Sequence, residues 1–178
     1  MKLKLDLHTH PYEATGIREP DVGLATEIVT AIKACRLDGI AVTEHEDSEF
    51  GYKLKYLVER HFPDQVVIIP GREVVVSELG FAEVVELYLP SGVVFRFLAH
   101  PSYPYPDQFA AGLSSLHGIE LRNGLHDRQL DCEKIRAMAG EYGLLLLENS
   151  DAHRLRDIGL FYNEVDLDEL ASRAVAGR

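Results

Sequence analysis

The sequence predicts an α/β protein with a mainly parallel sheet, folded as a small irregular barrel. Short apolar segments alternate with helix-like segments along the whole chain, which is the pattern of strand–helix units. About seven segments have strand character, which favours a barrel over an open nucleotide-binding sheet. No G-x-G-x-x-G turn or P-loop occurs to support a nucleotide fold. The length of 178 residues predicts a single domain spanning 1–178.

Each expected strand is a short apolar run bounded by turn-forming residues. These runs are residues 3–7, 39–43, 66–70, 82–89, 93–99, 118–122 and 144–148, with a last short strand at 162–165. The runs 82–89 and 93–99 predict a hairpin, because the turn Pro90-Ser91-Gly92 separates them.

The expected helices have apolar residues at intervals of three to four. In the first helix Leu24, Ile28 and Ile32 follow this spacing, and Asp21 stands near its start as a capping residue. The helices are expected at residues 20–37, 52–61 and 127–142, with a closing helix from Asp168.

The charge of the chain limits its partners. The formal net charge of −11 disfavours long nucleic acid, whose binding needs a basic face. A small phosphorylated substrate stays compatible, since divalent metals invert the local charge of a carboxylate-rich site. No apolar run approaches the roughly 18 residues needed to span a bilayer, so no membrane partner is expected. Cys35 and Cys132 lack C-x-x-C spacing and are expected to be reduced, which predicts a cytoplasmic location.

Metal-capable side chains follow five of the expected strands. In parallel α/β sheets and barrels the carboxyl ends of the strands carry the active site. The five polar segments are residues 6–10, 43–47, 71–73, 100–101 and 149–153. Surface polarity alone does not explain five such placements, so the sequence predicts a metal site at this rim. His61 and His117 fall on the opposite rim and are expected to be structural or solvent-facing, whereas His126 stays open as a ligand.

The residue types at these strand ends suit a metal site. His8 and His10 share one face, because side chains alternate along a strand with a period of two. Asp151 and His153 have the same spacing. Imidazole combined with carboxylate suits zinc, iron or manganese, and a carboxylate such as Glu73 can bridge two ions.

At these residues the sequence resembles the PHP (polymerase and histidinol phosphatase) family of metal-dependent phosphoesterases. The matching motifs are DLHTH at 6–10, TEH at 43–45, GRE at 71–73, AHP at 99–101 and SDAH at 150–153, in the family's order. The resemblance implies a distorted seven-stranded (β/α) barrel with a cluster of two or three ions at its C-terminal rim. It implies a bridging role for Glu73 within a ligand set of His8, His10, His45, Glu73, His100, Asp151 and His153.

Three positions depart from the family pattern. Thr15 stands where the family often has an Asp or His ligand, and whether Glu13 substitutes for it is open. The second motif has Glu44 in place of the usual Asp. After the strand at 118–122 some members supply another histidine, where this chain offers Glu120, Asn123 and His126. We therefore expect two divalent ions, with a third position left open.

The expected reaction is hydrolysis of a small phosphomonoester or phosphodiester by a hydroxide that bridges the metals. Its expected catalytic residues are Glu73, Asp151, His153 and Arg154, with Arg18 and Arg122 as further candidates for phosphate contact. One alternative is an amidohydrolase-like enzyme, but its usual bridging lysine is missing, since no lysine occurs between Lys55 and Lys134. The other is a catalytically weak, metal-holding regulatory domain. The oligomeric state is open.

Overall fold

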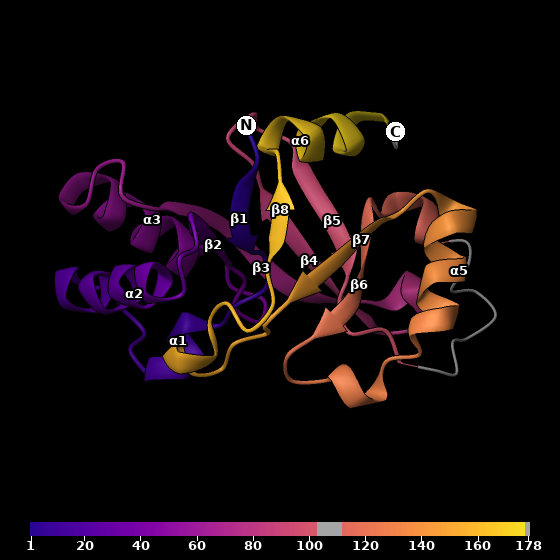
Figure 1. Ribbon diagram of the computed structural model, residues 1–178, viewed down its shortest axis with the longest axis horizontal. Helices are drawn as coiled ribbons and strands as arrows, with labels where there is room; N and C mark the ends of the chain where they lie inside the picture. The colour runs from indigo at the N-terminus through magenta and orange to yellow at the C-terminus, as the bar shows by residue number, and fades with distance from the viewer. Residues whose placement is uncertain (103–111, 177–178) are drawn as a thin grey trace.

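Eight strands form one sheet, in the order β7-β6-β5-β4-β3-β2-β1-β8 (Figure 1). The computed structural model describes residues 1–102 and 112–176. The strands are β1 (Leu3–Asp6), β2 (Gly39–Val42), β3 (Val67–Val76), β4 (Ala82–Tyr88), β5 (Val94–Leu98), β6 (Gly118–Asn123), β7 (Leu145–Asn149) and β8 (Asn163–Val165). The described α-helices are α1 (Pro11–Thr15), α2 (Val22–Ala34), α3 (Glu49–His61), α5 (Cys132–Tyr142) and α6 (Leu167–Ala176).

Six of the strands run in the same direction. Strand β1 is parallel to β2 and β2 to β3, while β5, β6 and β7 are parallel to one another. Strand β4 is antiparallel to both β3 and β5, and β8 is antiparallel to β1. The carboxyl ends of these six strands therefore meet at one rim, as expected for an α/β barrel.

Two different contacts close the sheet into a nearly complete barrel, one between the edge strands β7 and β8 and one between the segments beyond β7 and β1. The side chain of Asn163 on β8 accepts a hydrogen bond from Glu148 N on β7 (2.9 Å) and donates one to Glu148 O (2.8 Å). Nearer the rim, Thr9 beyond β1 pairs in parallel with Ala152 beyond β7. The seam is thus held by one buried amide side chain along β8 and by backbone pairing at the rim.

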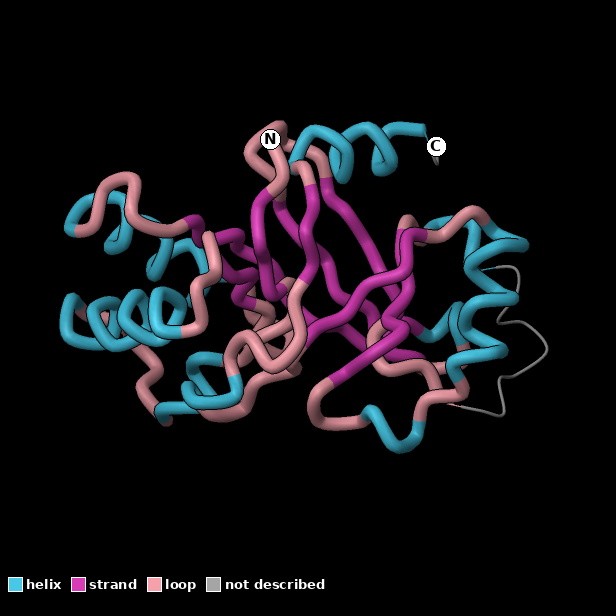
Figure 2. Tube along the Cα trace, in the orientation of Figure 1, coloured by secondary structure: helices cyan, strands magenta, loops and turns pink. Residues whose placement is uncertain are grey.

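Helices surround the strands on the outside of the barrel (Figure 2). Helix α6 covers the end opposite the rim, where Leu170 and Ala174 join Leu5 and Phe97 in the barrel interior. Helices α2 and α3 pack on the outer side of β2, and α5 packs on the outer side of β6. Among the described helices, none combines the length and apolar character that a bilayer span requires.

The structure confirms the α/β barrel and corrects the bounds of two predicted elements. Strand β3 has 10 residues, so Glu73 lies inside it and not beyond its end, because pairing with β4 continues to Val76. Helix α5 begins at Cys132, since the Asp131 side chain accepts from Lys134 N (3.2 Å) and caps it there. Strand β8 lies where the last short strand was expected, at 162–165, and makes the sheet eight-stranded where the family resemblance implied seven.

We expect Asn163→Ala to weaken the seam between β7 and β8. It removes the donor and acceptor that serve Glu148, leaving two backbone groups without their partner. The free energy of unfolding should fall by about 1–3 kcal/mol, measured by urea denaturation. Glu164→Ala, on an exposed position of the same strand, is the matched control and should change little. Equal stability of the Asn163→Ala variant and wild type would contradict this account of the closure.

Candidate metal centre

Backbone hydrogen bonds bring the first and last histidine motifs together. Asp151 N donates to His8 O (2.9 Å), and His10 N donates to Ala152 O (3.0 Å). These bonds extend β1 and β7 past their ends and set the side chains against each other. As a result Asp151 Oδ1 lies 3.2 Å from His10 Nε2 and 3.6 Å from His8 Nε2.

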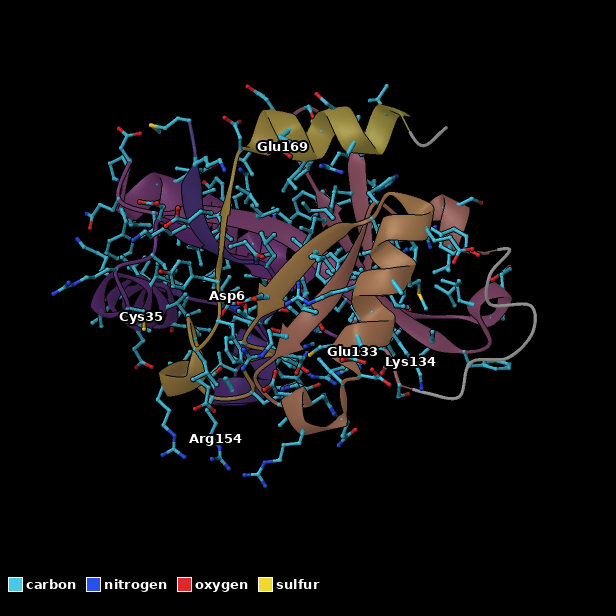
Figure 3. All side chains as sticks on the ribbon, turned by 45° about the vertical axis from the view of Figure 1, so that its right-hand side comes forward. Asp6, Cys35, Glu133, Lys134, Arg154 and Glu169 are labelled. Carbon is cyan, nitrogen blue, oxygen red and sulfur yellow. The ribbon has the colours of Figure 1, made fainter. Side chains whose placement is uncertain are left out.

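Asp6 holds the loop that carries Asp151. Its buried carboxylate accepts hydrogen bonds from Ser150 N (3.1 Å), Ser150 Oγ (2.5 Å) and Gly159 N (2.9 Å), so it ties both ends of this loop to β1 (Figure 3). Burial raises the pKa of Asp6 to about 6, against the lowering effect of these donors. The group is therefore ionised at neutral pH, the state that accepts from every donor around it.

Two of the candidate ligands have strained backbone conformations. His100 has φ of 23° and Asp151 has φ of 52°, in a region that residues other than glycine seldom adopt. Hydrogen bonds hold both in place, from His100 N to Glu120 Oε2 (2.7 Å) and from Asp151 N to His8 O (2.9 Å). Such strain persists where the surroundings over-determine it, and it is frequent at functional sites.

The carboxylate of Glu73 lies at the middle of the cluster. It is 2.9 Å from His100 Nε2 through Oε1, and 3.3 Å from His45 Nδ1 through Oε2. The same Oε2 lies 3.5 Å from His8 Nε2 and 3.6 Å from His10 Nε2. Four imidazoles from the segments that follow β1, β2 and β5 therefore face one buried carboxylate, an arrangement suited to a carboxylate that bridges ions.

Buried polar atoms without a hydrogen-bond partner point to metal binding. Within the described residues these include His8 Nε2, both ring nitrogens of His10, and Asp151 Oδ1. Leaving such groups unpaired costs about 1–3 kcal/mol each, so their clustering calls for a bound partner. Divalent ions accept both nitrogen and carboxylate donors. The donor set therefore fits metal ions, with His8, His10, Glu73 and Asp151 as the buried candidate ligands.

Glu120 orients His8 for this role. Glu120 Oε1 lies 2.9 Å from His8 Nδ1 and also accepts from Asn149 Nδ2 (2.8 Å), while Oε2 accepts from Asn123 Nδ2 (2.9 Å). A carboxylate at Nδ1 favours the tautomer with its proton there, which directs the Nε2 lone pair into the cluster. Glu120 thus orients the candidate ligand His8 from behind, through the ring nitrogen that points away from the cluster.

The carboxylates and imidazoles of the cluster stabilise each other's charged forms. Burial alone would raise the pKa of Glu73, but the nearby His8 and His100 lower it well below its usual range. Burial is likewise outweighed at Asp151, where His8 and His10 lower the pKa. Burial would lower the pKa of His8, yet Asp151, Glu73 and Glu120 together raise it well above its ordinary value. Without metal, His8 therefore holds a proton whose positive charge balances the neighbouring carboxylates. Metal binding must displace this proton.

The structure brings all seven expected ligands to one rim, while their roles as ligands stay predictions. His45 and His153 form the outer edge of the cluster beside His10, and all three offer donor atoms within 4.8 Å of one another. Glu13 lies on the same side, 3.2 Å from His153 Nε2. His126 also borders the cluster, 3.8 Å from Asp151 Oδ2.

The three arginine candidates lie outside the cluster. Arg122 makes a two-pronged ion pair with Asp127, and Arg18 donates to Tyr12 Oη (3.1 Å). Arg154 follows His153 but is exposed, at the outer edge of the molecule (Figure 3). His117 accepts from Arg96 N (2.9 Å) at the far end of β6, which agrees with the structural role expected for it.

Two acidic residues near the cluster make contacts that the sequence did not predict. Glu83 Oε2 lies 3.6 Å from His100 Nδ1, a contact that depends on the β3–β4 hairpin. Glu44 divides its two oxygens between the cluster and α1, and its Oε2 lies 3.9 Å from His10 Nδ1. Its Oε1 accepts from Tyr12 N (2.6 Å) and so holds α1 at the rim, and burial raises its pKa to about 8. The only sequence feature that pointed to this contact with Tyr12 was the side chain of Glu44, which is one methylene longer than the family's Asp.

Fold and rim together define an α/β barrel with a histidine–carboxylate centre. The family model described as PHP-associated matches residues 129–176, and no curated protein matches the sequence. The matched segment covers α5, β7, β8 and α6.

Three solved structures have a similar fold. One is a proposed metal-dependent phosphoesterase from Bifidobacterium adolescentis, with TM-score 0.72 and 13% identity over 98% of each chain. Another is PsfC from Pseudomonas syringae, with TM-score 0.68 and 19% identity over 89% of this chain and 79% of that one. The third is an amidohydrolase from Chromobacterium violaceum with bound sulfate and no metal, with TM-score 0.65 and 16% identity over 95% and 96%.

The raised pKa of Glu44 gives a prediction for the metal-free protein. The folded state keeps this proton to about pH 8, whereas the ordinary value is 4.5, so this group makes the chain less stable as pH rises between them. Glu44→Gln stays neutral and can still accept from Tyr12 N, so it should abolish this contribution. In chelator-treated samples, the stability of the variant relative to wild type should increase from pH 6 to pH 8 in urea denaturation. Parallel pH profiles of the two proteins would contradict the assignment.

Proposed function

We propose that this chain is a metal-dependent hydrolase that acts on a small phosphate ester. The observation that carries the proposal is the set of buried, unpaired donors, His8 Nε2, His10 Nε2 and Asp151 Oδ1, around the Glu73 carboxylate. Atoms that face one another without hydrogen bonds at the rim of an α/β barrel suit a catalytic metal centre better than a structural core.

Charge supports metal-assisted binding of an anion. Glu73, Asp151 and Glu13 face the cluster, and none of the ion pairs formed by their described side chains involves a lysine or arginine. A phosphate would be repelled by these carboxylates unless cations lay between them. The net charge of −11 adds to this repulsion for long nucleic acid, so we propose a small substrate.

Five residues of the cluster would serve as metal ligands. His8, His10, Glu73 and Asp151 would hold the buried ions, His100 would complete the side near Glu73, and Zn²⁺, Mn²⁺ or Fe²⁺ would each suit this donor set. When bound, such ions lower the pKa of water and polarise a phosphoryl oxygen. Glu73 and Asp151 stay ionised through their lowered pKa values and therefore act as ligands and not as proton donors.

Two expected catalytic residues have more restricted roles in this proposal. His153 Nδ1 lies 3.0 Å from Asp151 O, which assigns its proton to Nδ1 and leaves the Nε2 lone pair for a metal. It therefore does not protonate the leaving group. Arg154 borders a shallow depression beside Thr15 and Ile17. There it could contact an anionic part of the substrate away from the reacting phosphorus.

An amidohydrolase reaction is the second candidate, favoured by the fold shared with the Chromobacterium violaceum protein. Against it, the position that faces the histidines is held by Glu73, and the sequence has no lysine between Lys55 and Lys134 to serve as a carboxylated bridge. The phosphate ester is therefore the preferred substrate class.

The proposal predicts manganese-dependent hydrolysis of a generic aryl phosphate. His8→Ala and Asp151→Ala each remove a buried ligand and should reduce turnover by about 100-fold or more, since even supporting residues of metal sites cost 10–100-fold. His61→Ala, an exposed histidine at the end of α3, is the matched control and should keep full activity.

Unchanged turnover in both His8→Ala and Asp151→Ala would contradict the proposed metal-dependent hydrolysis. The same samples assayed with an aryl amide decide between the two candidates, because metal-dependent amide cleavage without phosphate release would favour the amidohydrolase reaction.

A further inference from the structure

Glu13 lies where no ligand was securely expected. It belongs to the first turn of α1, which Glu44 holds at the rim through Tyr12 N. Its carboxylate spans the two outer histidines, with Oε1 3.6 Å from His45 Nε2 and Oε2 3.2 Å from His153 Nε2. These are its ion-pair contacts within the described residues. The Glu13 carboxylate thus faces two imidazoles that come from different strands.

The distances fit donors that share an ion. Two ligands about 2.0–2.2 Å from a tetrahedral metal lie about 3.3–3.6 Å apart, longer than a direct N–H···O hydrogen bond of about 2.9 Å. The separation of 3.6 Å lies within this range for a shared ion, and the separation of 3.2 Å lies just below it, at the long end for a direct hydrogen bond. His153 is also oriented for this, because its Nδ1 lies 3.0 Å from Asp151 O and its Nε2 faces Glu13.

We propose that Glu13 is the carboxylate ligand of an outer divalent ion that is also held by His45 and His153. The inference rests on the proposed metal-dependent function and extends it to a ligand that the sequence pattern had placed at residue 15. The Thr15 hydroxyl is instead engaged inside α1, where it donates to Pro11 O at 2.8 Å, and it carries no charge for a cation. Glu13 lies two residues earlier and supplies the missing charge.

Exposure separates this ion from the buried ones. The side chains of His45, Glu13 and His153 are 44%, 39% and 31% exposed, whereas those of His10, Glu73 and Asp151 are at most 2% exposed. Solvent and chelators can reach the outer donors directly, so the outer ion should exchange faster than the inner ions. It would also be the ion that an incoming substrate meets first.

The test uses metal content and metal release, so it does not depend on catalysis. Wild type and Glu13→Gln are loaded with Mn²⁺, dialysed and analysed for metal per chain, and Mn²⁺ release to excess chelator is followed by stopped flow. We expect wild type to release one ion in a fast phase and the others slowly. Glu13→Gln should lack the fast phase and bind one fewer ion, with the outer site weakened about 10–100-fold.

Two control variants separate coordination from charge and position. Glu19→Gln removes one exposed negative charge, on a residue that pairs with Lys53, and should keep wild-type metal content and both release phases. Thr15→Ala tests the family position and should behave likewise. Circular dichroism and thermal unfolding confirm that each variant is folded.

The outcomes distinguish this inference from the proposed function. Loss of one fast-releasing ion in Glu13→Gln supports the inference, even if no phosphate ester is hydrolysed. Wild-type metal content and release kinetics in Glu13→Gln overturn it, even if the enzyme is a phosphoesterase. A wild-type chain that binds no Mn²⁺ overturns both.

Discussion

The parallel pairing of Thr9 with Ala152 is the contact on which the site depends. It closes the barrel at the rim and brings the two motifs nearest the chain's ends into register, which sets Asp151 against His8 and His10. Asp6 secures one partner of this pair through Ser150 and Gly159, and Asn163 secures the seam below it. Closure of the fold and assembly of the candidate metal centre therefore depend on the same contacts.

That coupling has an electrostatic consequence. The rim concentrates buried carboxylates and imidazoles whose mutual attraction lowers the pKa of Glu73 and Asp151 and raises that of His8. Removing one partner of such a buried network leaves a charge uncompensated, which costs several kcal/mol. Metal ions satisfy the same groups without a proton on His8. The centre should thus stabilise the barrel when metal is bound, and metal affinity should rise with pH as His8 loses its proton.

The sequence predicted the rim well because local rules decide it. Period-two alternation put His8 and His10 on one face, and the polarity of parallel strands put the motifs at one end. What depends on long-range packing could not be predicted. The antiparallel β3–β4 pairing, which places Glu73 inside a strand and Glu83 near His100, left no local signal. Nor did the sequence reveal that Glu44 accepts a hydrogen bond from Tyr12 N, which holds α1 at the rim with Glu13 beside His45.

The central claim is that divalent ions occupy the space between the Glu73 and Asp151 carboxylates. Its most direct test is the anomalous scattering of crystals grown with Mn²⁺ and measured at the manganese edge. The account predicts strong peaks within about 2.4 Å of oxygens of both carboxylates and of the Nε2 atoms of His8 and His10. Peaks confined to surface carboxylates, or no peak at the rim in a well-ordered crystal, would contradict it.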